Sequence, residues 1–380
     1  MHNIEMVDLR RQYAKIKPEI DRAIDRVIDT AAFINGPDVR EFADELASYL
    51  GVKHVIPCAN GTDALQISLM ALGLKPGDEV ITPSFTYIAT VEVVALLGLK
   101  PVFVDVDERT FTMDVASLRN AINPKTKAII PVHLYGHSAP MQEILDIANE
   151  KQIPVIEDNA QALGGDYIYS DGTKVKNGSM GLIGCTSFFP SKNLGCYGDG
   201  GAMFTNDDAL AVKLKMISNH GQSKKYIHDL VGCNSRLDTI QAAILRVKLK
   251  HLNSYCEARK RAADYYDFAF ANSENIQTPY RAKHTNHVFH QYTIQLVGVD
   301  RSLLTAHLAT KNIPSMLYYP VPSHKQKMFE KLNDRNFELP VTERLQDQVL
   351  SLPMHTELTI EELKYITDCV LEGIMNQKTN

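Results

Sequence analysis

From about residue 51 onward the sequence alternates short apolar runs with stretches of helical periodicity, and few folds accommodate this order. The pattern predicts strands at 52–57, 79–82, 101–106, 127–132, 153–158 and 202–205. Helices are expected between or after them at 88–97, 115–122, 140–151, 207–218 and 236–251. Strands that alternate with helices favour an α/β fold with a mostly parallel central sheet and helices on both faces.

The two ends of the chain read differently from this middle part. Residues 16–29 have the pattern of an amphipathic helix, and the sequence after about 260 mixes short strands, such as 292–297, with helices. A chain of 380 residues is long enough for one large and one small domain. We predict an N-terminal segment with the large domain at 1–255 and a smaller α+β domain at 256–380.

Charge and composition exclude several classes of partner. The net charge of -5 gives no electrostatic case for nucleic acid or an anionic membrane. No apolar run is long enough to cross a bilayer, and residues 1–11 lack the apolar core of a signal peptide. The six cysteines show no CxxC pair and no metal-ligand spacing. We therefore expect a reduced, cytoplasmic protein without a bound metal.

Lys192 is the first candidate for chemistry. It follows Phe188, Phe189 and Pro190 and precedes a glycine-rich turn. Because lysine is costly to bury unless it pairs or reacts, this position suggests an amine that forms an imine with an aldehyde cofactor. The alternative is an ordinary surface lysine on a loop.

Two further motifs fall at the predicted ends of strands, where parallel sheets gather ligand groups. The turn at 60–63 opens a helix, so its backbone N–H groups and Thr62 could hold an anion, although a plain helix cap would look the same. Glu157 and Asp158 end an apolar strand, and alternation should turn one carboxylate to the core and the other to a cleft. A protonated pyridine nitrogen would suit the second; a helix cap or a metal ligand is the alternative.

Tyr87 and Ser187 complete the set. Tyr87 could cover a flat ring, although a core aromatic is the alternative. Ser187 precedes Lys192 by five residues, and an extended strand rising ~3.3 Å per residue would place the two on the order of 10 Å apart or somewhat more. An anion cup, a ring platform, a carboxylate and a lysine are together the parts of a pyridoxal phosphate site.

Five motifs of this chain recur together in one known family. They are Asn60-Gly61-Thr62-Asp63-Ala64-Leu65, Glu157-Asp158-Asn159-Ala160-Gln161, Ser187-Phe188-Phe189-Pro190-Ser191-Lys192, the segment 232–241 and Tyr318-Tyr319-Pro320-Val321-Pro322. In these motifs the chain resembles the sugar-nucleotide aminotransferases of the DegT/DnrJ type, and the resemblance covers nearly the whole chain. These are pyridoxal phosphate enzymes of fold type I, the aspartate aminotransferase fold.

The resemblance implies a role for each matching residue around the cofactor. Lys192 forms the imine and moves the substrate proton. Asp158 contacts the pyridinium nitrogen, Gln161 lies beside the phenolic oxygen, and Tyr87 stacks on the ring. The phosphate is held by the helix start at Gly61, Thr62 and Asp63, by Ser187, and by Asn234 of a second subunit, which implies a homodimer with a shared active site.

The resemblance also implies the reaction. An amino acid, expected to be glutamate, gives its amino group to a keto-sugar nucleotide in a ping-pong sequence. The chain is most similar to the branch that aminates C3 of UDP-2-acetamido-2-deoxy-3-oxo-glucuronate in polysaccharide or lipopolysaccharide biosynthesis; another 3-keto or 4-keto sugar nucleotide is the alternative. Candidate substrate residues are Arg236, Tyr318, Tyr319 and His324, and an inter-subunit ion pair is the alternative for Arg236.

Two other functions fit the same fold. Related sugar dehydratases have histidine where this chain has Lys192, so the lysine argues against a dehydratase. A non-catalytic regulator is disfavoured by the intact set of residues from Thr62 to Lys192.

Overall fold

The computed structural model describes residues 4–330 and 336–378, and it is organised around one large sheet. Its strands follow the spatial order β3-β2-β4-β5-β8-β9-β1, because two parallel bridges, Ile129–Val155 and Val132–Asp158, join the β4 segment to the β5 segment. Every neighbouring pair is parallel except the two that β9 makes. The strands are β1 (His54–Cys58), β2 (Glu79–Pro83), β3 (Lys100–Val104), β4 (Thr126–Ile129), β5 (Ile156–Asp158), β8 (Ile183–Ser187) and β9 (Gly201–Thr205).

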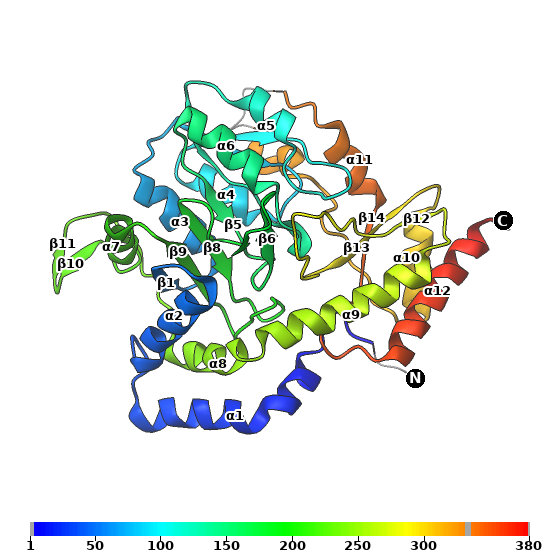
Figure 1. Ribbon diagram of the computed structural model, residues 1–380, viewed down its shortest axis with the longest axis horizontal. Coiled ribbons are helices and arrows are strands. Elements are labelled where there is room, and N and C mark those ends of the chain that lie inside the picture. Colours follow the sequence, from blue (N-terminus) through cyan, green and yellow to red (C-terminus); the bar gives the residue numbers. More distant parts are fainter. Residues whose placement is uncertain (1–3, 331–335, 379–380) are drawn as a thin grey trace.

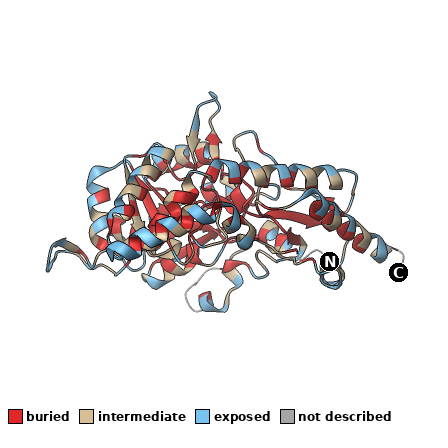
Figure 2. Ribbon diagram, turned by 90° about the horizontal axis from the view of Figure 1, so that it is seen from below, coloured by how far each residue is buried: buried red, intermediate tan, exposed pale blue. Residues whose placement is uncertain are grey.

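Helices cover both faces of this sheet, as the alternation of buried side chains along each strand requires. In β2, Val80 packs into the core on the side of α3 and α4, whereas Ile81 packs against α5 and α6. In Figure 2 the buried strands lie between the helical layers. The helices are α1 (Leu9–Thr30), α2 (Pro37–Leu50), α3 (Gly61–Leu72), α4 (Ala89–Leu96), α5 (Val115–Ala121), α6 (Met141–Lys151), α7 (Asp208–Ile217) and α8 (Thr239–Leu249).

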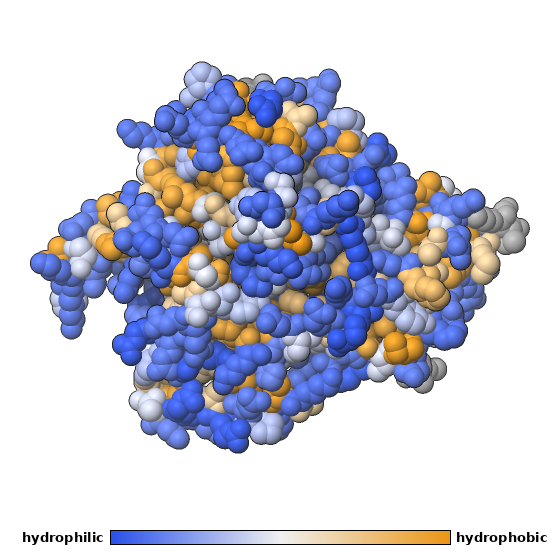
Figure 3. Space-filling view, in the orientation of Figure 1, coloured by the Kyte–Doolittle hydropathy of each residue, from blue (hydrophilic) through white to orange (hydrophobic). Residues whose placement is uncertain are grey.

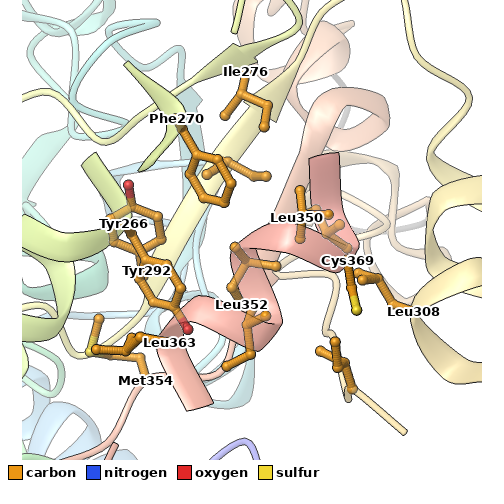
Figure 4. Close-up of a cluster of buried hydrophobic side chains, with 14 of the residues drawn as sticks. Tyr266, Phe270, Ile276, Tyr292, Leu308, Leu350, Leu352, Met354, Leu363 and Cys369 are labelled. Carbon is orange, nitrogen blue, oxygen red and sulfur yellow. The ribbon is translucent and has the colours of Figure 1, made fainter. Parts of the chain in front are cut away.

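The C-terminal part forms a smaller α+β unit. Its antiparallel sheet has the order β12-β13-β14, and Tyr266, Tyr292 and Leu352 belong to the apolar core that Figure 4 shows. The predicted fold class is thus confirmed. The predicted boundary between 255 and 256 falls inside α9 and stays a prediction. The elements are α9 (Leu252–Phe270), β12 (Ile276–Gln277), β13 (Tyr292–Leu296), α10 (Arg301–Thr310), α11 (Pro340–Gln348), β14 (Val349–Leu352) and α12 (Ile360–Lys378).

Two small hairpins lie outside these units. One pairs β6 (Asp166–Ile168) with β7 (Lys174–Lys176); the other pairs β10 (Gln222–Lys224) with β11 (Ile227–His228) and projects from the body next to α7 (Figure 1). The face in Figure 3 is mostly hydrophilic, with apolar residues in small groups. Within the described part of the chain, no helix combines the length and the apolar character needed to span a membrane.

Candidate active site

The start of α3 lies against the end of β8, and a glycine allows the close approach. A Cβ atom on Gly61 would lie 2.7 Å from the Cβ of Ser187, far inside normal contact. Asn60 caps the helix, since its Oδ1 accepts a hydrogen bond of 2.8 Å from the Asp63 N–H. The Asp63 N–H is therefore used within the chain, and the N–H groups of Gly61 and Thr62 and the Ser187 hydroxyl remain to form the anion cup.

Glu157 and Asp158 end β5 and point in opposite directions, as predicted. The Glu157 carboxylate is fully buried and accepts hydrogen bonds from backbone N–H groups in the segment 178–181. It also lies 2.8 Å from His133 Nε2, which must be the donor because His133 Nδ1 accepts from the Ala139 N–H. Glu157 is therefore a structural anchor, and Asp158 is the carboxylate that faces the candidate site.

Asp158 is fixed by two donors, one on each oxygen. The hydroxyl of Thr90 in α4 donates to Oδ2 over 2.8 Å, and the Ala160 N–H donates to Oδ1 over 3.1 Å. Asp158 is only 5% exposed. Its remaining oxygen lone pairs could accept a hydrogen bond from the N–H of a cationic ring nitrogen without any rearrangement of the carboxylate.

Lys192 lies in the irregular turn after β8. The expected extended run from Ser187 to Lys192 is wrong, because residues 188–200 form turns and the Lys192 N–H bonds to the Phe189 carbonyl over 2.8 Å. Burial lowers the pKa of the Lys192 amine to about 8, and the nearby Asp158 carboxylate partly opposes this shift. The turn thus places a readily deprotonated amine close to Asp158, which suits imine chemistry.

Tyr87, Gln161 and Tyr319 form the next part of the site. Tyr87 is 56% exposed, so it is not a core aromatic, and its ring centre lies 6.1 Å from that of Tyr319. The Tyr135 N–H donates to Gln161 Oε1 over 2.8 Å, so the Gln161 amide nitrogen faces the other way and donates to the Tyr319 hydroxyl over 3.1 Å. Gln161 therefore presents a donor toward these rings.

The remaining predicted residues lie outside this group, some beside the α3 cap and others in the segment 318–324. Asn234 is exposed and Arg236 partly buried, while Ser235 between them accepts a hydrogen bond from the Ala59 N–H beside the α3 cap. His324 was expected to face the substrate, but its ring nitrogens contact Ser84 and Glu343. Tyr318 accepts a hydrogen bond on its carbonyl from the Tyr135 hydroxyl.

Sequence reasoning missed two residues beside this group. Thr90 lies in the first turn of α4, three positions after Tyr87. The sequence around it contains no signal that it bonds to Asp158, 68 residues away. His290 is buried and carries an unpartnered Nδ1; burial keeps its pKa well below the usual value, and the charge of Lys192 lowers it further. A neutral imidazole therefore lies near the amine.

The residues present fit a phosphorylated aromatic aldehyde. A glycine cradle and a helix N-terminus could receive the phosphate, Lys192 could take the aldehyde, and Asp158 could hold the ring nitrogen. Tyr87 and Gln161 could contact the ring between them. Each of these groups was expected from the sequence, and the fold brings them to one edge of the sheet.

Comparison with known proteins identifies the family. Residues 14–371 match the DegT/DnrJ/EryC1/StrS aminotransferase family. The chain is 48% identical to the UDP-2-acetamido-2-deoxy-3-oxo-D-glucuronate aminotransferase of Pseudomonas aeruginosa, covering 96% of this chain and 98% of that protein. It is 45% identical to the pleiotropic regulatory protein of Geobacillus stearothermophilus, covering 97% and 98%. It is 47% identical to the UDP-N-acetyl-3-dehydro-alpha-D-glucosamine 3-aminotransferase of Acidithiobacillus ferrooxidans, covering 97% of each.

Solved structures agree with this match. A DegT/DnrJ/EryC1/StrS aminotransferase from Brucella abortus has a TM-score of 0.91 at 41% identity, covering 98% of this chain and 99% of that one. A Bacillus subtilis protein solved with bound cofactor PMP has a TM-score of 0.88 at 33% identity, covering 97% and 83%. The predicted family, enzyme class and cofactor are therefore confirmed: the chain belongs to the DegT/DnrJ/EryC1/StrS family and is a pyridoxal phosphate-dependent aminotransferase.

Proposed function

We propose that this enzyme moves an amino group from L-glutamate to C3 of a UDP-linked 2-acetamido-3-keto-glucuronate, as a step in polysaccharide or lipopolysaccharide biosynthesis. The observation that carries this proposal is the 48% identity, over almost the full length of both chains, to the Pseudomonas enzyme whose name states that substrate. The absence of a membrane-spanning helix among the described residues is compatible with a cytoplasmic enzyme acting on a nucleotide sugar. We also propose that the large domain ends at residue 255.

Lys192 and Asp158 carry the chemistry in this proposal. When bound, pyridoxal phosphate supplies an aldehyde that takes up the donor's amino group and a ring that accepts the electron pair left by the departing α-proton. With a pKa of about 8, the Lys192 amine has an appreciable neutral fraction at neutral pH, and the neutral amine can bond to an aldehyde or take a proton from the donor's α-carbon. Asp158, held by Thr90 and Ala160, keeps a proton on the ring nitrogen.

The other site residues bind the cofactor and orient its ring. The N–H groups of Gly61 and Thr62 and the hydroxyl of Ser187 would hold the phosphate at the positive end of α3. Tyr87 would cover one face of the ring, and the Gln161 amide, fixed by Tyr135, would donate its other proton to the phenolic oxygen.

The site is proposed to be shared by two copies of the chain. Asn234 is exposed and would reach the phosphate of the partner. Lys192→Ala and Asn234→Ala proteins should each be inactive alone, and mixing them should restore activity. In a mixed dimer one of the two sites keeps both Lys192 and Asn234, so about a quarter of all sites are intact after random mixing. No recovery in a sample shown to exchange subunits would contradict the shared site.

The function itself is tested with a panel of 3-keto and 4-keto sugar nucleotides and nitrogen-labelled glutamate. We expect the label in a 3-amino product, detected by mass spectrometry, and its loss in Lys192→Ala. Label in a 4-amino product would refute the C3 assignment. No transfer to any acceptor, from glutamate or other amino donors, would favour a regulatory role, as the name of the Geobacillus relative suggests for that protein.

A second acceptor is favoured by a specific observation. The chain is 47% identical to the Acidithiobacillus enzyme, whose name gives UDP-N-acetyl-3-dehydro-glucosamine as its acceptor. This value is almost equal to the 48% identity with the Pseudomonas enzyme. The two sugars differ at C6, where one bears a carboxylate and the other a hydroxymethyl group. Arg236 could bind that carboxylate in a bidentate manner. Arg236→Gln should therefore impair the glucuronate acceptor at least tenfold more than the glucosamine acceptor, and equal losses would argue against this contact.

A further inference from the structure

Ser84, His324 and Glu343 form a hydrogen-bonded array beside the candidate site. The Ser84 hydroxyl lies 2.7 Å from His324 Nδ1, and His324 Nε2 lies 3.3 Å from Glu343 Oε1. Ser84 is fully buried, and the His324 side chain is 5% exposed. Glu343 is 34% exposed and also pairs with Lys325 over 2.8 Å, so the buried part of the array is the Ser84–His324 pair. Buried polar groups need partners, and each group of this pair has one.

The backbone determines the direction of these hydrogen bonds. The N–H groups of Ser323 and His324 donate to the Ser84 carbonyl and hydroxyl oxygens. The Ser84 hydroxyl therefore accepts from the His324 N–H and donates its own proton to Nδ1, which leaves Nε2–H to donate to Glu343. Ser84 thus uses its carbonyl and its hydroxyl to bind one short segment.

The array joins three elements that are far apart in sequence. Ser84 follows β2 and precedes Tyr87 by three residues, His324 ends the segment that carries Tyr318 and Tyr319, and Glu343 lies in α11. The start of α11 is itself fixed at the end of β3: Asp105 accepts hydrogen bonds from the N–H groups of residues 341 and 342. Residues 318–324 are thus tied at their far end to the sheet edge.

The near end of the same segment is tied to the active site. The Tyr135 hydroxyl donates to the Tyr318 carbonyl, and Gln161 donates to the Tyr319 hydroxyl. Lys192 and Asp158 are held separately, by the turn after β8 and by Thr90 and Ala160. Loosening the far end would therefore leave Tyr318 and Tyr319 with these two hydrogen bonds alone, while the two reactive groups keep their supports.

We propose that Ser84, His324 and Glu343 form a clamp whose role is to position Tyr318 and Tyr319 for the keto-sugar acceptor. This inference rests on the proposed function, because it assigns the segment to one of its two substrates. Both substrates react beside Lys192 and Asp158, but glutamate is small, whereas a sugar nucleotide extends further and needs additional contacts to be oriented. His324 is accordingly a positioning residue and does not itself contact the sugar.

The test separates the two half-reactions in the holoenzyme. Both reactions begin with the aldehyde form of the cofactor, and the visible absorbance of the cofactor reports their progress. One reaction uses L-glutamate, and the other uses the amino-sugar nucleotide that the wild-type enzyme converts fastest. In Ser84→Ala and His324→Leu we expect kcat/KM for the amino sugar to fall about tenfold or more, with the glutamate reaction changed less than about threefold. His324→Asn should recover much of the loss, because its Oδ1 can replace Nδ1 as acceptor.

The outcomes are distinct. Ser254→Ala removes a surface hydroxyl bond on α9 and should change neither half-reaction. Equal losses with both substrates in folded Ser84→Ala and His324→Leu proteins, or no rescue by His324→Asn, would overturn the clamp. A wild-type enzyme that reacts with glutamate but with no amino-sugar nucleotide would instead refute the proposed function, and the clamp's assignment with it.

Discussion

Replacing Thr90 by valine removes one hydroxyl with little change of shape, and it tests how Asp158 is held. Thr90 is 1% exposed and donates to Asp158 Oδ2 over 2.8 Å. A buried hydrogen bond to a charged acceptor contributes about 1.5–3 kcal/mol, which corresponds to roughly 10- to 150-fold in a rate or binding constant. Because Asp158 serves both substrates, we expect Thr90→Val to slow both half-reactions by a factor in this range.

The assay is single-turnover kinetics of each half-reaction, with a thermal melt to show that the variant is folded. Thr90→Ser keeps the hydroxyl and should stay within about threefold of the wild-type rate. Thr86→Val is a matched control, since Thr86 is also buried and lies 3.2 Å from the Thr90 hydroxyl but does not bond to Asp158. If folded Thr90→Val shows wild-type rates with both substrates, Asp158 does not depend on this hydroxyl and the reasoning is wrong.

Three further predictions address other groups. The pKa of Lys192 near 8 predicts that the rate at which the apoprotein recombines with pyridoxal phosphate rises with pH and levels off above about pH 8, because the neutral amine reacts; a rate still rising at about pH 10 would indicate an ordinary lysine. Glu157→Gln should lower the free energy of unfolding by about 2–4 kcal/mol in a denaturant titration, because an amide N–H₂ would face buried N–H donors, whereas the exposed Glu150→Gln should change it by less than about 0.5 kcal/mol. Gly61→Ala should weaken pyridoxal phosphate binding about tenfold or more, measured by absorbance titration, because the new Cβ would crowd Ser187; unchanged affinity would exclude a close phosphate cup there.

Much of the large domain could be predicted from the sequence because its strands and helices each have a characteristic local pattern of apolar residues. The predicted strand at 79–82 is β2 (Glu79–Pro83), and the predicted helix at 140–151 is α6 (Met141–Lys151). Helix α2 (Pro37–Leu50) was missed although Phe42, Leu46 and Leu50 recur at helical spacing and are buried. The turn after Ser187 was read as a strand because aromatic residues favour strands, but Pro190 and the following glycines favour turns there.

The supports of the site could not be predicted from the sequence. Thr90 and Asp158 are 68 residues apart, and Ser84 and His324 are 240 apart. No local pattern links such pairs, because their proximity depends on which parallel strands are neighbours and how far each strand extends. The carboxylates Glu157 and Asp158 at the end of a strand were recognisable from residue types, and Gln161 only from the family resemblance. The assignment of His324 to the substrate left out Ser84, the nearest group that can bond to its ring.

Buried hydrogen bonds hold the site residues in place at the ends of three strands of the sheet. At β5, Glu157 binds backbone N–H groups on the side opposite Asp158. At β2, Ser84 binds the segment of Tyr318 and Tyr319 three residues before Tyr87. At β8, the Phe188 N–H and the Cys196 N–H close the turn that carries Lys192 through hydrogen bonds to the carbonyls of Gly200 and Phe188. Preorganised groups need no rearrangement during the reaction, so these buried polar contacts should matter for rate as well as for stability.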